Sequence, residues 1–196
     1  MKLPNQNGMT PLTEEELAEL IPPTIFTREH LNQWEQINIQ EAMTWAFSHK
    51  HLPTKLATNQ FMTKLHKKMF GQVWKWAGQF RSSNKNIGVD REYIQIELRK
   101  LSDDFLVWIE YKSYPLDEIA ARFHHRLVWI HPFPNGNGRH ARLMADLILV
   151  SLGGKKFSWG SGQNLAAEGA VRKQYIQALK AADGYDYGPL LGFVRS

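Results

Sequence analysis

The sequence predicts an all-α fold, a helical bundle with one small β-hairpin. Apolar residues recur at every third or fourth position through most of the 196 residues, which is the spacing of amphipathic helices. Proline and glycine pairs interrupt that spacing where helices would end. With 43% hydrophobic and 22% charged residues and no internal repeat, the chain has the composition of one globular domain.

The first expected helix is short. Thr13 and Glu16 have the spacing of a capping box, and Pro22 and Pro23 end the pattern. We therefore expect residues 1–26 to form an N-terminal arm with a short helix and residues 27–196 to form the main domain. Two longer helices are expected at 28–49 and 58–74, the second with one apolar face of Phe61, Leu65, Met69 and Val73.

Glycine and polar residues then break the helical spacing between residues 78 and 88, which favours a small hairpin. Helical spacing returns at 94–108, and a further helix follows Pro115 as far as Ile130. Another is expected from Arg139 until Gly153 and Gly154 stop it. The last long helix is expected at 172–182.

Bulk properties exclude several classes of protein. The chain has no cysteine, which excludes disulfides and cysteine-ligated metal sites. We see no signal-peptide pattern and no apolar run near the roughly 18 residues that span a bilayer, so a cytoplasmic protein without a membrane partner is expected. The net charge of +5 permits an anionic partner, but the 24 basic and 19 acidic residues are interspersed.

The segment "HPFPNGNGRHAR", residues 131–142, gathers cations where a helix should begin. Positive charge is unfavourable there, because the first N–H groups of a helix already carry partial positive charge. Residues 136–138 can place successive backbone N–H groups in a concave turn, and Arg139 and Arg142 share a helix face behind it. A bound polyphosphate would supply the missing negative charge. His131 could accept a proton from a hydroxyl nucleophile.

These residues resemble the signature of the Fic family, HxFx(D/E)GNGRxxR in one-letter code, and the resemblance extends over residues 31–194. Within the family it is closest to the group called mobile mystery protein B. The resemblance implies a Fic-like bundle that transfers AMP from ATP to a Ser, Thr or Tyr hydroxyl of a target protein, self-modification included. It implies that His131 is the general base, that Phe133 anchors the loop, and that the phosphates are bound by Gly136, Asn137, Gly138, Arg139 and Arg142, with help from the Asn137 side chain.

The resemblance also implies a target-binding flap that aligns the target backbone as an added strand, made of Ser82, Ser83, Asn84, Lys85, Asn86, Ile87 and Gly88. One position departs from the family pattern, because Asn135 stands where an acidic residue holds the divalent ion. A neutral amide is a poor ligand for magnesium, so weakly bound Mg²⁺ is expected. With a weakly held metal ion, the expected activity is that of a slow AMP transferase. The alternatives are an enzyme with another nucleotide or phosphate-containing donor, or a phosphate-binding protein with little catalysis.

Members of the family often carry an inhibitory helix with the pattern [ST]xxxE[GN], whose glutamate pairs with the second motif arginine. No segment of this chain matches it fully. Glu35 has Leu31 and Gln36 at the flanking positions, and Glu168 has Asn164 in place of the hydroxyl residue. We expect Glu35 to be the inhibitory residue, held against Arg142.

Two rival interpretations are weaker. A metal cluster of His124, His125, His131 and His140 lacks the spacing of a zinc motif. A nucleic-acid-binding module could use the arginines for phosphates and the seven tryptophans for stacking. The tryptophans, however, lie mostly within apolar helical stripes, which disfavours nucleic acid as the partner.

Overall fold

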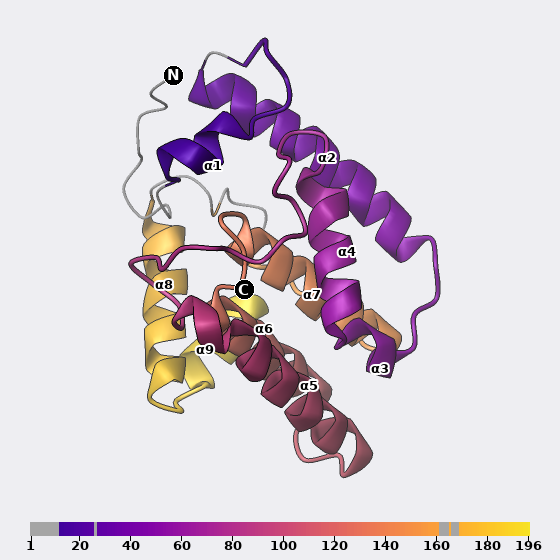
Figure 1. Ribbon diagram of the computed structural model, residues 1–196. Helices are drawn as coiled ribbons and strands as arrows, with labels where there is room; N and C mark the ends of the chain where they lie inside the picture. Colours follow the sequence, from indigo (N-terminus) through magenta and orange to yellow (C-terminus); the bar gives the residue numbers. More distant parts are fainter. Residues whose placement is uncertain (1–11, 26, 161–164, 166–168) are drawn as a thin grey trace.

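The computed structural model describes residues 12–25, 27–160, 165 and 169–196. Over these residues the chain is a bundle of helices joined by loops (Figure 1). The elements are α1 Glu14–Ala18, α2 Arg28–Phe47, α3 Pro53–Leu56, α4 Asn59–Phe70, a short 3₁₀ helix Arg91–Tyr93, α5 Ile94–Glu110, α6 Leu116–Ile130, α7 Asn137–Ser151, α8 Ala170–Asp183 and α9 Gly188–Val194. The all-α prediction is therefore confirmed.

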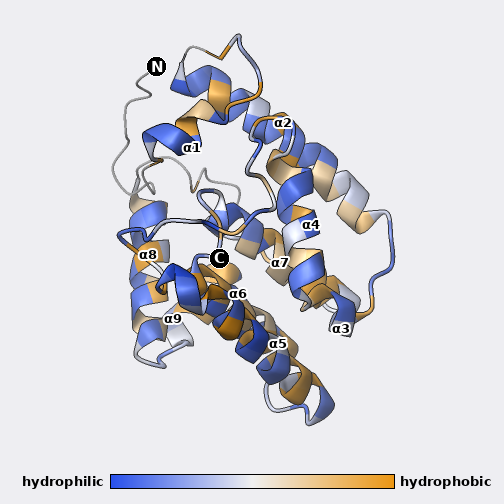
Figure 2. Ribbon diagram, in the orientation of Figure 1, coloured by the Kyte–Doolittle hydropathy of each residue, from blue (hydrophilic) through white to orange (hydrophobic). Residues whose placement is uncertain are grey.

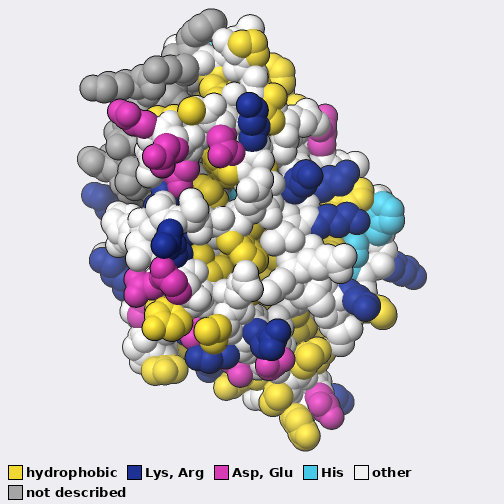
Figure 3. All heavy atoms as spheres, in the orientation of Figure 1, with side chains coloured by type: hydrophobic (Ala, Val, Ile, Leu, Met, Phe, Trp, Pro, Cys, Tyr) yellow, Lys and Arg dark blue, Asp and Glu magenta, His cyan; other side chains and the backbone are white. Residues whose placement is uncertain are grey.

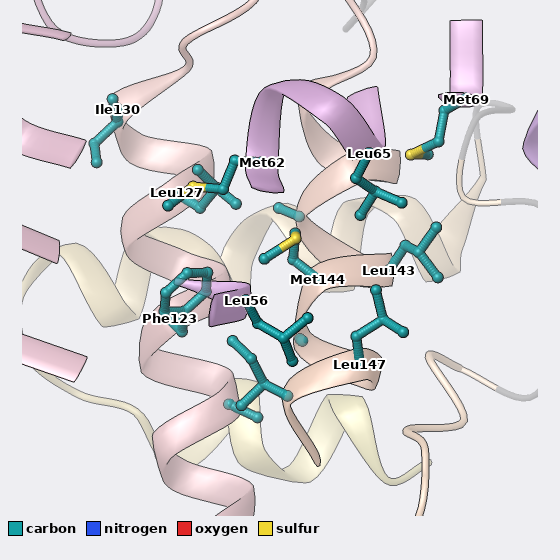
Figure 4. Close-up of a cluster of buried hydrophobic side chains, with 14 of the residues drawn as sticks. Leu56, Met62, Leu65, Met69, Phe123, Leu127, Ile130, Leu143, Met144 and Leu147 are labelled. Atoms are coloured by element: carbon teal, nitrogen blue, oxygen red, sulfur yellow. The ribbon is translucent and has the colours of Figure 1, made fainter. Parts of the chain in front are cut away.

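Helix α7 organises the core, because it packs against α6 on one side and against α2, α3 and α4 on another. Figure 4 shows the side chains that meet there, namely Leu56, Met62, Leu65, Met69, Phe123, Leu127, Ile130, Leu143, Met144 and Leu147. Burial of each large apolar side chain contributes about 1.5–3 kcal/mol. The packing fixes the axis of α7, and with it the position of its N-terminus.

The other helices are amphipathic, and Figure 2 shows hydrophobic and hydrophilic residues alternating along α4 and α5. Helix α4 begins where Thr58 accepts a hydrogen bond from the Phe61 amide at 3.2 Å. It ends at Phe70, earlier than predicted, because Gly71 and the following turns take over. No helix within the described ranges is long and apolar enough to cross a lipid bilayer.

The predicted hairpin is wrong: residues 78–90 are all described and contain no strand. The buried side chain of Arg81 lies at the centre of this loop. It donates hydrogen bonds to the carbonyl oxygens of Ser83, Val89 and His131. Because these bonds occupy acceptors that a strand ladder would need, the loop folds around one guanidinium group instead of pairing with itself.

The N-terminal arm lies against the segment that follows α4. The Ile21 amide donates to the Val73 carbonyl at 2.9 Å, and the Lys75 amide donates to the Glu19 carbonyl at 3.0 Å. The capping box at Thr13 is present, as its sequence spacing predicts. The arm therefore joins the bundle through main-chain hydrogen bonds, in addition to side-chain packing.

Candidate active site

The turn before α7 depends on a glycine. Gly136 has φ 77°, in the left-handed region, and a Cβ atom at this position would lie 2.5 Å from the Phe70 ring. The first bond of the helix runs from the His140 amide to the Gly136 carbonyl at 2.9 Å. The amides of residues 137–139 precede that bond, so they have no partner within the helix and project from its positive end. The geometry suits a phosphate group.

Two further contacts hold the loop in shape. The side chain of Asn137 donates to the Phe133 carbonyl at 2.8 Å and accepts from the Phe133 amide at 2.9 Å. Phe133 is fully buried and stacks on the ring of His66 at a centroid distance of 3.7 Å. His66 in turn accepts from the Gly78 amide and donates to the Asn135 carbonyl at 3.1 Å. The Asn137 side chain, expected to assist the phosphates, is thus engaged with the loop backbone.

His131 is the residue that ends α6, in the left-handed conformation with φ 55°. His131 is only 5% exposed, and a Cβ atom at Gly88 would lie 2.5 Å from the His131 Cβ, so the Gly88 backbone approaches it closely. Burial, together with the nearby charges of Arg81 and Lys85, lowers the pKa of His131 to about 4. The imidazole is therefore neutral at pH 7 and able to accept a proton.

Arg81 was missed by the sequence analysis. Its Nε donates to the His131 carbonyl at 2.8 Å, and its own amide donates to the Pro132 carbonyl at 2.9 Å. These bonds join the 82–88 loop, expected as the target-binding flap, to the residues beside the candidate base. Within the loop, Lys85 forms an ion pair with Glu16 of α1 at 2.6 Å, and both side chains are nearly covered.

The two motif arginines have different surroundings. Arg139 forms an ion pair with Glu35 of α2 at 2.6 Å and lies over the Phe70 ring. Arg142 lies over the Tyr175 ring at 5.7 Å, and burial lowers its pKa while Tyr175 opposes that shift. The expected pairing of Glu35 with Arg142 is therefore wrong: the carboxylate binds Arg139, because a second hydrogen bond from Trp74 Nε1 at 2.7 Å fixes its direction.

A cavity of about 1020 Å³ lies between α2 and α7. Its lining comes from α2, from α7 with both motif arginines, and from the segment after α7. The lining residues are Glu29, Asn32, Gln33, Gln36, Ile37, Ile39, Met43, Arg139, Arg142, Leu143, Asp146, Ser158, Trp159 and Leu165. Asp146 was not predicted as a site residue. Burial raises its pKa to about 6, and it accepts hydrogen bonds from the Phe157 amide and from Trp159 Nε1.

The residues present do not fit a dedicated magnesium site. The Asn135 side-chain oxygen accepts from the Gly136 amide at 2.7 Å and from Arg139 at 3.4 Å. The carboxylate of Glu35, which shares Arg139 with Asn135, is already paired with that arginine. Magnesium in proteins is usually held by one or two carboxylates together with water and substrate phosphates, and neither group offers a carboxylate oxygen that is not engaged.

The other three histidines of the metal cluster considered from the sequence have hydrogen-bond partners in the protein. His124 bonds Tyr175, His125 bonds Asp183, and His140 bonds the Met62 carbonyl. Among the residues that the structure describes, no group of three or more metal-ligating side chains occurs. The second inhibitory candidate, Glu168, lies outside the described residues.

Comparisons with known proteins identify relatives of this chain. Residues 56–149 match the model of the Fic/DOC family. The chain is 27% identical over 165 residues to "Protein adenylyltransferase Fic" of Nematostella vectensis, which covers 82% of this chain and 36% of that protein. The chain thus spans little more than a third of that relative's length.

Two solved structures have the same fold. Fic-1 of C. elegans, residues 134–508, superposes with a TM-score of 0.66 at 24% identity, over 91% of this chain and 51% of that chain. The N-terminal Fic domain of a cell filamentation protein from Bartonella quintana, solved with bound ADP, gives 0.66 at 18% identity over 88% and 86%. Because the match to the Fic/DOC family model includes the motif loop, this chain belongs to the Fic/DOC family.

Proposed function

We propose that this protein is a protein adenylyltransferase that transfers AMP from ATP to a hydroxyl side chain of a target protein. The observation that carries the proposal is the loop between α6 and α7. It places a neutral, buried His131 a few residues from the helix-end amides and from both motif arginines. The relative from Nematostella vectensis is named a protein adenylyltransferase, and the Bartonella quintana domain binds ADP, which support the same chemistry.

The reaction balances with the groups present. The target hydroxyl oxygen attacks the α-phosphorus of ATP, and its proton passes to the His131 imidazole. A new oxygen–phosphorus bond forms while the bond between the α-phosphorus and the bridging oxygen breaks, and pyrophosphate leaves. The amides of residues 137–139 and the charges of Arg139 and Arg142 stabilise the phosphate oxygens, which is the main catalytic contribution in phosphoryl chemistry.

The 82–88 loop supports a second part of the proposal. It is bonded to the backbone beside His131 through Arg81, and Ile87 at its tip is 49% exposed. A target segment lying along this loop would bring its hydroxyl to the imidazole, with Ser, Thr and Tyr all as acceptors. Magnesium has a minor role in this proposal, because it would be held mainly by the phosphates of the nucleotide.

Labelled ATP, GTP, CTP and UTP, each incubated with the protein and followed by intact-mass analysis, test the function. We expect self-modification by the mass of AMP from ATP. If the mass added to the protein is that of GMP, CMP or UMP, the corresponding triphosphate is the donor in place of ATP. If nucleotides raise the melting temperature yet no mass is added to the protein or to lysate proteins, the chain binds phosphates without transferring them.

A further inference from the structure

A long part of the sequence carries cations without any anion. Between Glu41 and Asp90 there is no Asp or Glu, whereas the stretch contains Lys50, Lys55, Lys64, Lys67, Lys68, Lys75, Arg81 and Lys85. The whole chain has 24 basic and 19 acidic residues, so this asymmetry is local. It contrasts with the interspersed charge of the remainder.

The fold brings four of these lysines to one surface. Lys64, Lys67 and Lys68 lie on the exposed side of α4, and Lys50 lies in the loop between α2 and α3. We call these four residues the basic face. Figure 3 shows dark-blue side chains beside histidines on the side of the molecule where Figure 1 places α3 and α4. None of the four forms an ion pair with a carboxylate among the described residues.

Aromatic rings lie between the lysines. The ammonium groups of Lys64 and Lys68 lie 5.2 and 5.4 Å from the centre of the Trp45 ring. Phe61 stacks on Trp45 at 6.3 Å. The ring centres of His49 and His51 lie 6.1 and 6.2 Å from that of Trp45. Trp45, Phe61, His49 and His51 therefore form an aromatic cluster at the C-terminal end of α2.

The charge belongs to a different surface from the active site. The inner side of α4 contacts the motif loop through His66 and Phe70, whereas the basic face is on the outer side. The cations are therefore not explained by ATP binding. Residues three and four apart on a helix are about 5–6 Å apart, so the three lysines of α4 form a compact positive patch.

We propose that the basic face and its aromatic cluster bind single-stranded nucleic acid. Lysines that follow a phosphate backbone, together with rings on which bases stack, are the combination that binds single strands without sequence preference. An anionic membrane would instead require a broad apolar surface between the cations. Among the described residues from 45 to 68, Leu52 is the one large hydrophobic side chain that is strongly exposed. The inference is independent of the proposed AMP transfer, because it uses none of the motif residues. It reverses the expectation, drawn from the tryptophans of the apolar stripes, that nucleic acid is disfavoured as a partner.

The test uses fluorescence anisotropy with labelled oligo(dT) and oligo(rU) of about 20 nucleotides at several salt concentrations. The variant is Lys50→Glu, Lys64→Glu, Lys68→Glu. The matched control is Arg99→Glu, Lys173→Glu, Lys180→Glu, which makes the same change in net charge at exposed positions of α5 and α8. We expect the variant to lose at least about tenfold in affinity and about two units of the logarithmic salt slope, while the control keeps both.

Several outcomes would overturn the proposal. Equal losses in variant and control would mean that net charge alone attracts the strand. Equally tight binding of polyglutamate or of anionic vesicles would point to any polyanion or to a membrane. A Trp45→Leu variant that keeps its melting temperature and still binds oligo(dT) as tightly as the parent would remove the stacking role. A preference for oligo(rU) over oligo(dT) would support the proposal and indicate RNA.

Discussion

At the level of single residues, His131 is set apart from an ordinary surface histidine by its burial. Burial lowers the pKa of the imidazole to about 4, so it remains neutral across the range in which most proteins are stable. A neutral imidazole can accept the proton of an attacking hydroxyl, whereas an imidazolium cannot. Its carbonyl is bonded to Arg81, which fixes the residue at the end of α6.

His131→Ala should lower transfer by about 10²- to 10⁴-fold while leaving ATP affinity nearly unchanged. The reason is that a general base acts in the transition state and contributes little to binding of the nucleotide. Turnover by mass spectrometry and affinity by calorimetry check the two parts. Since the neutral form predominates above about pH 4, the rate attributable to His131 should be flat between pH 5.5 and 8. An inflection near 6.5 would contradict the burial of the imidazole.

Asn135→Asp should raise both the magnesium dependence and the transfer rate, because it introduces an anionic oxygen for a hard cation. The new carboxylate would lie within reach of Arg139, whose contact with Asn135 is 3.4 Å. Magnesium titrations of parent and variant provide the measurement. If the two titrations coincide, position 135 does not contact the metal.

The residues of the motif could be predicted because they are contiguous in the sequence. Arg81 and His66 could not, since their partners His131 and Asn135 are 50 and 69 positions away and no local pattern joins them. Asp146 lies two turns beyond Arg139 on the same helix, and a carboxylate inside the apolar run "LMADLILV" was the signal that could have revealed it.

Among the elements, α2 bears most directly on control of the site. Glu35 accepts from Trp74 with one carboxylate oxygen and binds Arg139 with the other. Glu35→Gln keeps an acceptor for Trp74 but removes the charge that competes with phosphate. We expect about tenfold tighter ATP binding, equivalent to about 1.4 kcal/mol, and faster self-modification.

Glu29→Gln is the matched control for this experiment, because Glu29 belongs to the same helix and lines the cavity into which Arg139 also faces. It removes an equal charge without touching Arg139. If both variants bind ATP as the parent does, α2 has no inhibitory role. A gain only in Glu168→Gly would assign that role to Glu168.

The long helices could be predicted from apolar spacing alone, since each has a face that meets α7 or its neighbours. The short helix α3 was not predicted, because four residues carry too little periodicity. Between residues 78 and 88 the glycine and polar composition favours a hairpin, but the loop contains no strand. Its shape depends instead on the single buried guanidinium of Arg81, and composition gives no indication of that arrangement.

Across the whole molecule, buried histidines make stability depend on pH. Burial lowers the pKa of His124 and His140 to about 3, of His131 to about 4, and of His66 well below 6.5. The unfolded chain binds protons at these positions from about pH 6.5 downward, whereas the folded chain does not. Folding stability must therefore fall as the pH decreases below 6.5.

Asp146 acts in the opposite direction, because its pKa rises from 3.8 to about 6, so its contribution is lost as the pH rises through that range. One carboxyl offsets only part of the effect of four histidines. We expect the melting temperature to fall by more than about 5 °C between pH 7 and pH 5. Calorimetry measures this, and His140→Gln should make the dependence shallower. Equal melting temperatures at the two pH values would contradict the burial of these groups.

The N-terminal arm determines how much of this chain can be moved or engineered as a unit. A chain cut at the predicted boundary of residue 27 would lose Glu16, the partner of Lys85, and the main-chain bonds that Glu19 and Ile21 make to residues 73–75. The 82–88 loop would then carry an uncovered Lys85 near His131. The smallest unit suited to fusion with another protein therefore begins at about residue 12, before the helices that flank the motif loop.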